Sequence, residues 1–323
     1  MPRLLERRPE LVLAAVTTLW ASTFIVTKDI VRTNAPLFYL TLRFSVGAAV
    51  LLALVPRALR PSRKTLRDGI VLGAGQAFGL ALQVFGQVYT TATKSSFVSS
   101  LSTALTPLLA LALYRERPSG AQATGVLLAT FGLLLLTYPT DGAEWNRGDL
   151  FSVACAAVYA GVIVETARRA RGSDVGALTA LQTVTAAICF GLAFLAAHGA
   201  AAVLPPERWP VLLRVEARPL AIGGKLLAQI SYMALVCTAG TFSAQTWAMS
   251  RMSAAHAAVV FALEPVFATG MAIAVEGASE WPGRRGAVGA GLVLAGVLAA
   301  EIRRRNRGQR AQTEGARAAL RRR

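Results

Sequence analysis

Two apolar stretches of the sequence carry a proline at mid-length, and one of them also carries a charge. Residues 262–267 read ALEPVF, so Glu264 directly precedes Pro265, whereas residues 104–109 read ALTPLL and contain Pro107. Proline has no N–H, so in a helix it leaves an earlier carbonyl without its donor and kinks the chain. An acid beside a free carbonyl is suited to bind a cation, an amine or a proton. Glu264 is therefore a candidate binding residue, and both prolines are candidate hinges.

The composition indicates that these stretches lie in lipid. The chain has 323 residues, of which 54% are hydrophobic and 16% charged, and its mean hydropathy is +0.50. A soluble domain has about 25% charged residues. Whole segments are apolar on all sides, which is typical of membrane spans. We predict an all-α integral membrane protein.

A transmembrane helix needs about 20 apolar residues, and by this length the sequence contains about ten transmembrane helices. Their expected limits are 10–30, 37–55, 70–89, 96–114, 122–138, 149–167, 176–198, 226–248, 255–275 and 286–302. The segment 199–225 holds too many prolines and charges to span, so we expect an interfacial loop or a short surface helix there. Basic residues concentrate in alternate linkers and in a tail at 303–323, which predicts that both termini are cytoplasmic.

Polar side chains inside these spans must find a partner or face water. Glu264 lies about 15 Å from either end of its span, where a charge costs at least about 2.5 kcal/mol. It either contacts substrate or a proton, or clamps a neighbouring helix. Arg43, about 10 Å from the outer boundary, either snorkels or pairs with Glu264, or attracts an anionic group such as a carboxylate.

Other candidates are weaker. Gln76, Gln83 and Gln87 follow one helical stripe, which serves either interhelical hydrogen bonding or cavity lining. Three more residues stand beside hydroxyl or amide side chains, as expected of a cavity wall. The complete set of candidate substrate- or proton-binding residues is Glu264, Arg43, Gln83, Gln87, Trp20, Ser99 and Tyr232.

The sequence offers no candidate catalytic or metal centre. It has only two histidines, and Cys155, Cys189 and Cys237 stand alone in apolar spans without CxxC spacing. No GxSxG, HExxH, P-loop or complete GxGxxG motif is present. The net charge of +17 comes from linkers and the tail rather than from a basic patch interleaved with aromatic residues. We therefore expect no enzyme, no cofactor, no metal and no nucleic-acid partner.

The chain also repeats itself. SSFVSSLSTALTPLLALALYRERPSG aligns with SAAHAAVVFALEPVFATGMAIAVEGASE, so that Pro107 matches Pro265. Further along, Gly125 matches Gly289 and Gly132 matches Gly296, and upstream LWASTFIVTK matches VYAGVIVETA. Because each half has five helices, an odd number, the second half enters the membrane from the opposite side. We expect one repeat at 1–145, an inverted repeat at 146–302 and a basic cytoplasmic tail at 303–323.

The order of these features resembles the drug/metabolite transporter superfamily, EamA type. The residues that carry the resemblance are LWASTF, LRF, ALTPLLALALYRERPS, LEPVFA and GAGLVLAG, in this order over about residues 10–300. Similarity to this family implies ten helices in two inverted five-helix repeats around a central cavity. It also implies transport of small organic solutes, often outward.

We therefore expect a secondary active transporter in the inner or plasma membrane. It would export small organic metabolites, amino acids or amphiphilic drugs by alternating access, with protons as a coupling ion. The first four helices of each repeat should line the cavity, and the fifth should pack outside it. Three alternatives stay open: an antiporter of phosphorylated or nucleotide-linked sugars, a membrane-embedded enzyme acting on lipid, and a scaffold or receptor that transports nothing.

Overall fold

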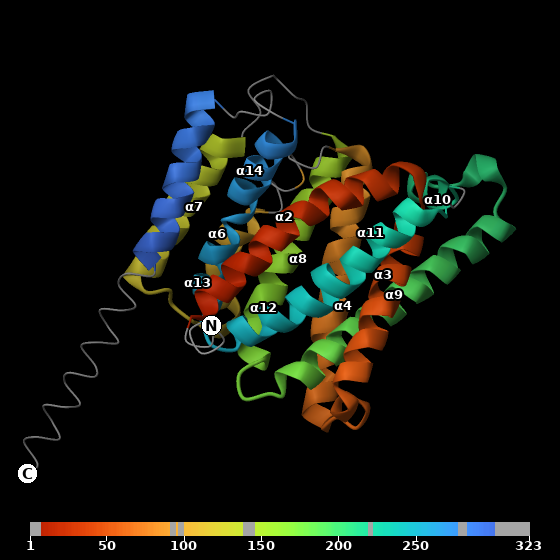
Figure 1. Cartoon of the computed structure of the whole chain (residues 1–323), viewed down its shortest axis with the longest axis horizontal. Coiled ribbons are helices and arrows are strands. Elements are labelled where there is room, and N and C mark those ends of the chain that lie inside the picture. Colours follow the sequence, from red (N-terminus) through yellow and green to blue (C-terminus); the bar gives the residue numbers. More distant parts are fainter. Residues whose placement is uncertain are drawn as a thin grey trace, which may run out of the picture.

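The computed structural model describes residues 8–90, 95, 100–137, 146–218, 222–276 and 283–300, and they form a bundle of long helices (Figure 1). Among the described residues, eight helical segments are long and apolar enough to cross a membrane, and two shorter apolar helices accompany them. The expected all-α membrane fold with about ten transmembrane helices is confirmed.

In the described part of the chain, the first repeat comprises five helices. They are α2 (Pro9–Thr33), α3 (Pro36–Leu54), α4 (Arg63–Tyr89), α6 (Ser102–Tyr114) and α7 (Gly120–Thr137), with a 3-10 turn, η1 (Pro56–Leu59), before α4. Proline opens α2 and α3, where its missing N–H leaves no helical bond unmade. Ser62 caps α4 by accepting a hydrogen bond from the backbone N–H of Thr65.

The second repeat begins with two long helices and continues with two interrupted ones. Its elements are α8 (Arg147–Arg169), α9 (Val175–Val203), η2 (Pro206–Arg208), α10 (Val211–Glu216), α11 (Gly224–Ala234), the π-helical segment η3 (Leu235–Gly240), α12 (Thr241–Met249), α13 (Ala254–Phe261), α14 (Glu264–Glu276) and the last described helix, Gly283–Ala300. Asn146 and Asp149 start α8 with a reciprocal capping box.

The ninth span differs from its expected form. A single helix kinked at Pro265 was expected, but α13 ends at Phe261 and α14 starts at Glu264. Pro265 thus lies in the first turn of a new helix, where proline fits well because no N–H is needed. Pro107, in contrast, lies inside α6 as expected. The break places Glu264 at a helix start within the span.

The long linker between α9 and α11 contains the expected short surface helix, α10. Its last residue, Glu216, is only 1% exposed and accepts hydrogen bonds from the backbone N–H groups of Leu37 (2.8 Å) and Phe38 (3.2 Å). These N–H groups belong to the first turn of α3 and have no partner within their own helix. Glu216 therefore fastens α10 to the start of α3.

The fifth helices of the two repeats pack against each other through glycines. A Cβ on Gly125 would lie 2.8 Å from the carbonyl oxygen of Gly296, and one on Gly132 would lie 2.6 Å from that of Gly289. Sequence alignment of the repeats pairs Gly125 with Gly289 and Gly132 with Gly296. The contact of Gly125 with Gly296 therefore has its equivalent, with the two repeats exchanged, in the contact of Gly289 with Gly132. This is the symmetry expected of two inverted repeats.

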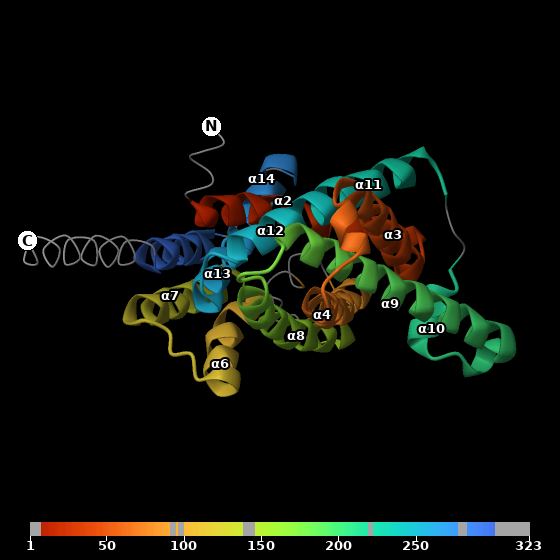
Figure 2. The same ribbon diagram turned by 90° about the horizontal axis from the view of Figure 1, so that it is seen from below.

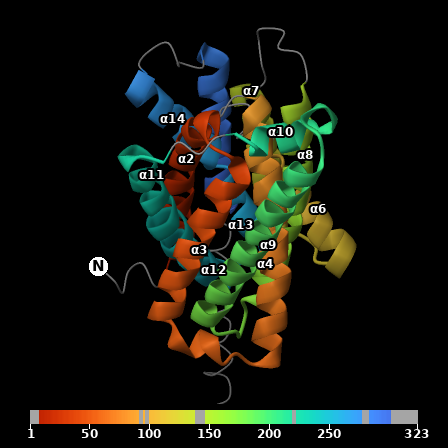
Figure 3. The same cartoon turned by 90° about the vertical axis from the view of Figure 1, so that its right-hand side faces the viewer.

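The remaining helices interlock across the two repeats. Figure 1 places α7 and Gly283–Ala300 together at one edge of the bundle and α3, α4 and α9 towards the opposite edge. α4 packs along both α8 and α9, and α3 packs along α9; Figure 2 shows α4 between α8 and α9. In Figure 3 most of these helices run in one common direction, as expected of a membrane bundle. Together these contacts leave a space in the middle.

Candidate functional site

A central cavity lies between the two repeats. Its lining residues come from α2, α3, α4, α6, α8, α12, α13 and α14, and are Trp20, Thr23, Phe24, Thr27, Arg43, Gln76, Leu80, Gln83, Val84, Gln87, Ser102, Tyr159, Val162, Ile163, Phe242, Gln245, Phe261 and Glu264. The cavity volume is about 80 Å³. Since about 10–15 Å³ by this measure holds one water molecule, the space suits several waters or a small solute.

Both fifth helices lie outside the cavity, as expected: none of its described lining residues comes from α7 or Gly283–Ala300. The expectation that α9 also lines it is wrong. A Cβ on Gly69 would lie 2.6 Å from Leu181, and one on Gly73 would lie 2.5 Å from the carbonyl oxygen of Gln182, so α4 approaches α9 closely. Gln182, which aligns with Arg43 in the other repeat, is buried in this contact.

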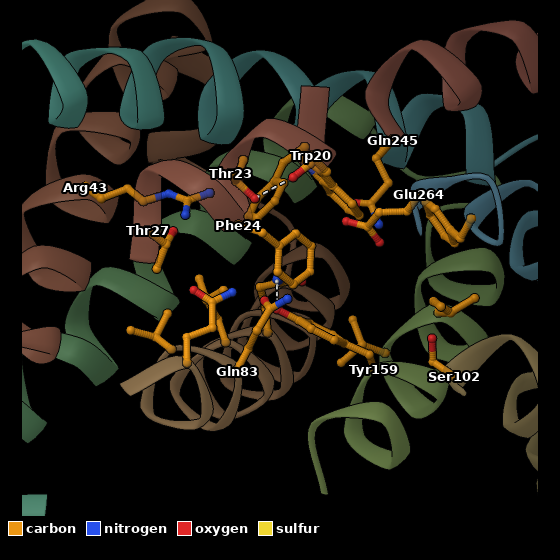
Figure 4. Close-up of a pocket in the computed structure, with 18 residues that line it drawn as sticks. Trp20, Thr23, Phe24, Thr27, Arg43, Gln83, Ser102, Tyr159, Gln245 and Glu264 are labelled. Atoms are coloured by element: carbon orange, nitrogen blue, oxygen red, sulfur yellow. Dashed lines mark hydrogen bonds between the residues drawn. The ribbon is translucent and has the colours of Figure 1, made fainter. Parts of the chain in front are cut away.

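Glu264 faces the cavity from the first turn of α14 (Figure 4). Its carboxylate forms no hydrogen bond or ion pair with another residue in the described part of the chain, and the side chain is partly exposed. The stacked rings of Trp20 and Phe261, with centroids 5.6 Å apart and an angle of 11°, line the same cavity. An unpaired carboxylate in a cavity that also presents aromatic rings suits an organic cation.

Arg43 lines the cavity on the side opposite Glu264, and Figure 4 shows Phe24 between them. Arg43 is 4% exposed, and its guanidinium group donates to Thr238 Oγ1 (2.8 Å), Tyr39 Oη (3.0 Å) and the Cys237 carbonyl (3.2 Å). It does not pair with Glu264. Three of its five N–H groups are used in these bonds, which leaves two that can bind a solute.

The position of Arg43 depends on the π-helical segment η3. Thr238 and Cys237 belong to η3, where the Thr238 hydroxyl also donates to the Met233 carbonyl five residues earlier (2.9 Å). Gly47, one turn beyond Arg43 on α3, lets the backbones approach: a Cβ there would lie 3.0 Å from Thr238. π-helical turns often occur at functional sites because they redirect backbone groups. Here η3 supplies two of the three acceptors for Arg43.

The glutamine stripe of α4 both makes hydrogen bonds and lines the cavity. Gln76 Nε2 donates to Tyr159 Oη, which in turn donates to Gln83 Oε1, and both bonds are long at 3.4 Å. The buried Gln87 Oε1 has no hydrogen-bond partner in the described part of the chain. Long or missing bonds to buried amide groups leave them able to bind a polar guest.

Of the other candidates, the structure brings only Trp20 to the cavity. Its indole N–H donates to Thr241 Oγ1 (2.9 Å) and thereby joins α2 to α12. Tyr232 is not among the lining residues: its hydroxyl is hydrogen-bonded to Ser22 (2.7 Å), so it joins α11 to α2 instead. Ser99 lies outside the described residues, although Ser102, from the same stretch, does line the cavity.

Tyr159 and Gln245 are two polar lining residues that sequence reasoning missed. Tyr159 aligns with Trp20 in the repeat alignment, so the repeat itself could have indicated it. Gln245 is a single amide side chain within a span. A single polar residue in a span can equally serve packing between helices, so the sequence does not mark Gln245 as a cavity residue. In the described part of the chain no group of three or more His, Cys, Asp or Glu side chains is placed to hold a metal ion.

Comparison with known proteins shows similarity to one family of membrane transporters. The sequence profile described as the EamA-like transporter family matches residues 8–138 and again residues 146–300. A protein of Archaeoglobus fulgidus named an uncharacterized transporter is 26% identical over 302 residues, covering 91% of this chain and 86% of that one. A second uncharacterized transporter of that organism is 27% identical over 154 residues, covering 46% and 55% of the two chains.

One solved crystal structure shares the fold. It superimposes with a TM-score of 0.70 at 20% identity, and the match covers 93% of this chain and 98% of that chain. At this identity the likeness concerns the fold alone.

Proposed function

Because the chain belongs to the EamA-like transporter family, we propose that this membrane transporter is a secondary exporter of small organic amines that works by alternating access. The observation that carries the proposal is the Glu264 carboxylate in a cavity between two inverted repeats, where it has no hydrogen-bond or ion-pair partner among the described residues. Transporters of this general design bind their substrates near the middle of the membrane, between the repeats, beside interrupted helices. Amino acids and amphiphilic drugs that carry an amine belong to this class.

Glu264 is proposed to hold either the substrate amine or a proton. A charged carboxylate near the middle of the membrane costs free energy, and binding a cation or a proton reduces this cost. Competition between the two would couple export of the amine to entry of protons. The cavity rings of Trp20 and Phe261 would favour an amine that carries an apolar group.

Arg43 is proposed to complete the site for substrates with an acceptor group. Its two remaining N–H groups would bind a carboxylate or carbonyl at the end of the cavity away from Glu264. The Gln87 Oε1, which lines the same cavity, would accept a hydrogen bond from a donor group of the substrate. Amino acids carry both charges and would use both ends. Apolar amines would depend on Glu264 and the rings alone.

The alternatives receive less support. An antiporter of phosphorylated or nucleotide-linked sugars needs several cations to hold its phosphates, whereas Arg43 is the single Lys or Arg among the described lining residues and Glu264 opposes it. A lipid-acting enzyme needs a cluster of acids or histidines at one interface, and the described lining has a single acid. A non-transporting scaffold would not need the repeats.

The moving parts are proposed to be the helices at Pro107 and Pro265. Pro107 interrupts the hydrogen bonding of α6, and Pro265 follows the break between α13 and α14. Both termini are proposed to face the cytoplasm across the inner or plasma membrane, because the basic linkers alternate in that sense.

Flux into proteoliposomes tests the proposal. Purified protein is reconstituted and given a mixture of amines, amino acids and sugar phosphates, with and without an imposed pH gradient. We expect amine flux that rises with the gradient and releases protons in exchange. Flux of sugar phosphates alone, or no flux of any solute under either condition, would overturn the proposal.

A further inference from the structure

A second cavity lies at one end of the bundle, apart from the central one. It lies between the start of α7, the turn between α8 and α9, and the turn between α12 and α13. Its lining residues are Gln122, Arg171, Ser250, Arg251, Met252, Ser253 and His256, and its volume is about 370 Å³. None of these residues lines the central cavity.

The two arginines of this cavity differ from three nearby arginines in their partners. Arg57, Arg168 and Arg169, in neighbouring linkers or helix ends, form ion pairs with Asp174, Glu116 and both Asp68 and Glu165, respectively. Arg171 instead donates to the Met252 carbonyl (3.1 Å). Arg251 donates to the Trp247 carbonyl and the Ser250 hydroxyl, both at 3.0 Å. Neither forms an ion pair with any carboxylate in the described part of the chain.

These neutral contacts hold both arginines in the lining of the same cavity. The bond to Met252 carries Arg171 across to the turn that contains Arg251, and the Arg251 guanidinium stacks on the Trp247 ring, 4.2 Å from its centroid. Two like charges without a counter-charge repel each other. Each guanidinium group still has N–H groups that can donate to a ligand. Arg171 donates through Nη2 alone, and Arg251 makes both of its hydrogen bonds through Nη1.

The remaining lining adds neutral polar groups. Ser253 receives a hydrogen bond from Gln122 Nε2 (2.7 Å) and caps α13 by accepting from the backbone N–H of His256 (3.2 Å). No Asp or Glu is among the described lining residues. Two guanidinium groups in such a cavity have the chemistry that binds phosphate.

We propose that this cavity binds a phosphate group, that of an anionic phospholipid headgroup. Trp247 beneath Arg251 suits the membrane interface. In the proposed orientation both arginines face the cytoplasmic leaflet, which is negatively charged, and basic pockets between helices at that surface bind anionic headgroups. A soluble phosphate ester would present the same chemistry, so the test below separates the two sources.

Binding there would join elements that also shape the central cavity. The phosphate would bridge the end of α8 to the start of α13, and α13 leads directly to the break before Glu264. The lipid would thus hold one end of an interrupted helix whose movement export is proposed to require. The binding itself does not depend on transport and is measured without it.

The test measures lipid binding to the full chain. Purified protein in neutral detergent is titrated with phosphatidylglycerol or phosphatidylcholine, followed by native mass spectrometry, and separately with glycerol phosphate or inorganic phosphate, followed by thermal shift. The test variant is Arg171→Ala/Arg251→Ala. The matched control is Arg60→Ala/Arg63→Ala, which removes two exposed arginines from a neighbouring linker.

We expect phosphatidylglycerol to bind more tightly than phosphatidylcholine. We expect the test variant to lose about thirtyfold in phosphatidylglycerol affinity, since Arg171 and Arg251 both line the cavity and each would contribute about 1 kcal/mol to binding the phosphate. The control should stay within about twofold. If only the soluble phosphates bind and the variant abolishes this, the site belongs to a soluble ester and the lipid assignment is overturned. Equal binding of both lipids, or equal loss in test and control, overturns the proposal. Should the double variant fail to fold, Arg251→Gln takes its place and must weaken phosphatidylglycerol binding.

Discussion

Arg43 and Glu264 face one cavity from opposite sides without forming an ion pair with each other. Arg43 is held by the hydroxyl groups of Thr238 and Tyr39 and by the Cys237 carbonyl. Glu264 has no comparable partner among the described residues. Neutralising one of these two side chains therefore removes no partner from the other. The roles of Arg43 and Glu264 can be tested separately.

Arg43→Lys tests the structural role of the guanidinium group. A lysine keeps the positive charge but cannot reach three acceptors in a planar arrangement, so at least one buried acceptor loses its donor. We expect the free energy of unfolding to fall by about 2 kcal/mol, with a lower melting temperature in detergent. Arg60→Lys, at an exposed site, should change it by less than about 0.5 kcal/mol. Equal melting temperatures for both variants would mean that the three bonds contribute little.

Gly132→Ala tests the contact between the two fifth helices. The new Cβ would lie 2.6 Å from the Gly289 carbonyl oxygen and 2.8 Å from the Val293 amide nitrogen, so the helices must separate. We expect a loss of about 1–3 kcal/mol in stability. Gly291→Ala is the control, because a Cβ there meets nothing within 4 Å. Thermal unfolding of both variants decides the matter: a Gly132 variant as stable as the Gly291 variant would contradict the close contact.

Glu216 should make stability depend on pH. Burial raises the pKa of Glu216 above its usual value of 4.5, although the two N–H groups from Leu37 and Phe38 act in the opposite direction. Between 4.5 and the raised pKa the folded chain keeps a proton that the unfolded chain has lost, so stability falls as pH rises through this range. Glu216→Gln removes this contribution. The difference between the melting temperatures of the two proteins should therefore change as the pH rises above 4.5, and parallel curves would refute the idea.

Pro265→Ala tests the proposed hinge. An alanine restores an N–H that can donate to the Phe261 carbonyl, which favours a helix continuous from α13 into α14. We expect turnover in proteoliposomes to fall about tenfold, the effect of about 1.4 kcal/mol on a conformational step, while substrate binding is kept. The control is Pro206→Ala, in an exposed turn. A flux equal to that of the control would show that the proline is not a hinge.

The fold was largely predictable because lipid imposes simple rules on sequence. A span must be apolar, long and helical, so most expected limits for the described helices fall within about three residues of the observed ones. The exceptions include the start of α4, which lies at Arg63 and was expected at 70, and the end of α9, which lies at Val203 and was expected at 198. The break at Ala262 and Leu263 and the π-helical turn at Leu235–Gly240 were not predicted. The π-helical turn carries Thr238, which accepts from Arg43 on α3, and no local pattern reveals this contact between helices.

The site was predictable in part, for a related reason. Polar residues within spans must avoid lipid, and the structure places Glu264, Arg43 and the glutamines in the cavity lining. That they bind substrate or a proton stays a prediction. The rule that polar residues avoid lipid could not separate a cavity wall from a contact between two helices, so Tyr232 was misplaced. The distinction depends on which face of α11 meets α2, and that is decided by packing.

Proton-coupled flux through Glu264→Gln is the most direct test of the central claim. Glutamine keeps the size of the side chain but cannot take up and release a proton. In proteoliposomes the variant should fold, yet lose the part of amine flux that a pH gradient drives, whereas Glu207→Gln, at an exposed site, should transport like the unaltered protein. If Glu264→Gln transports amines with undiminished dependence on the gradient, Glu264 is structural and the account is contradicted.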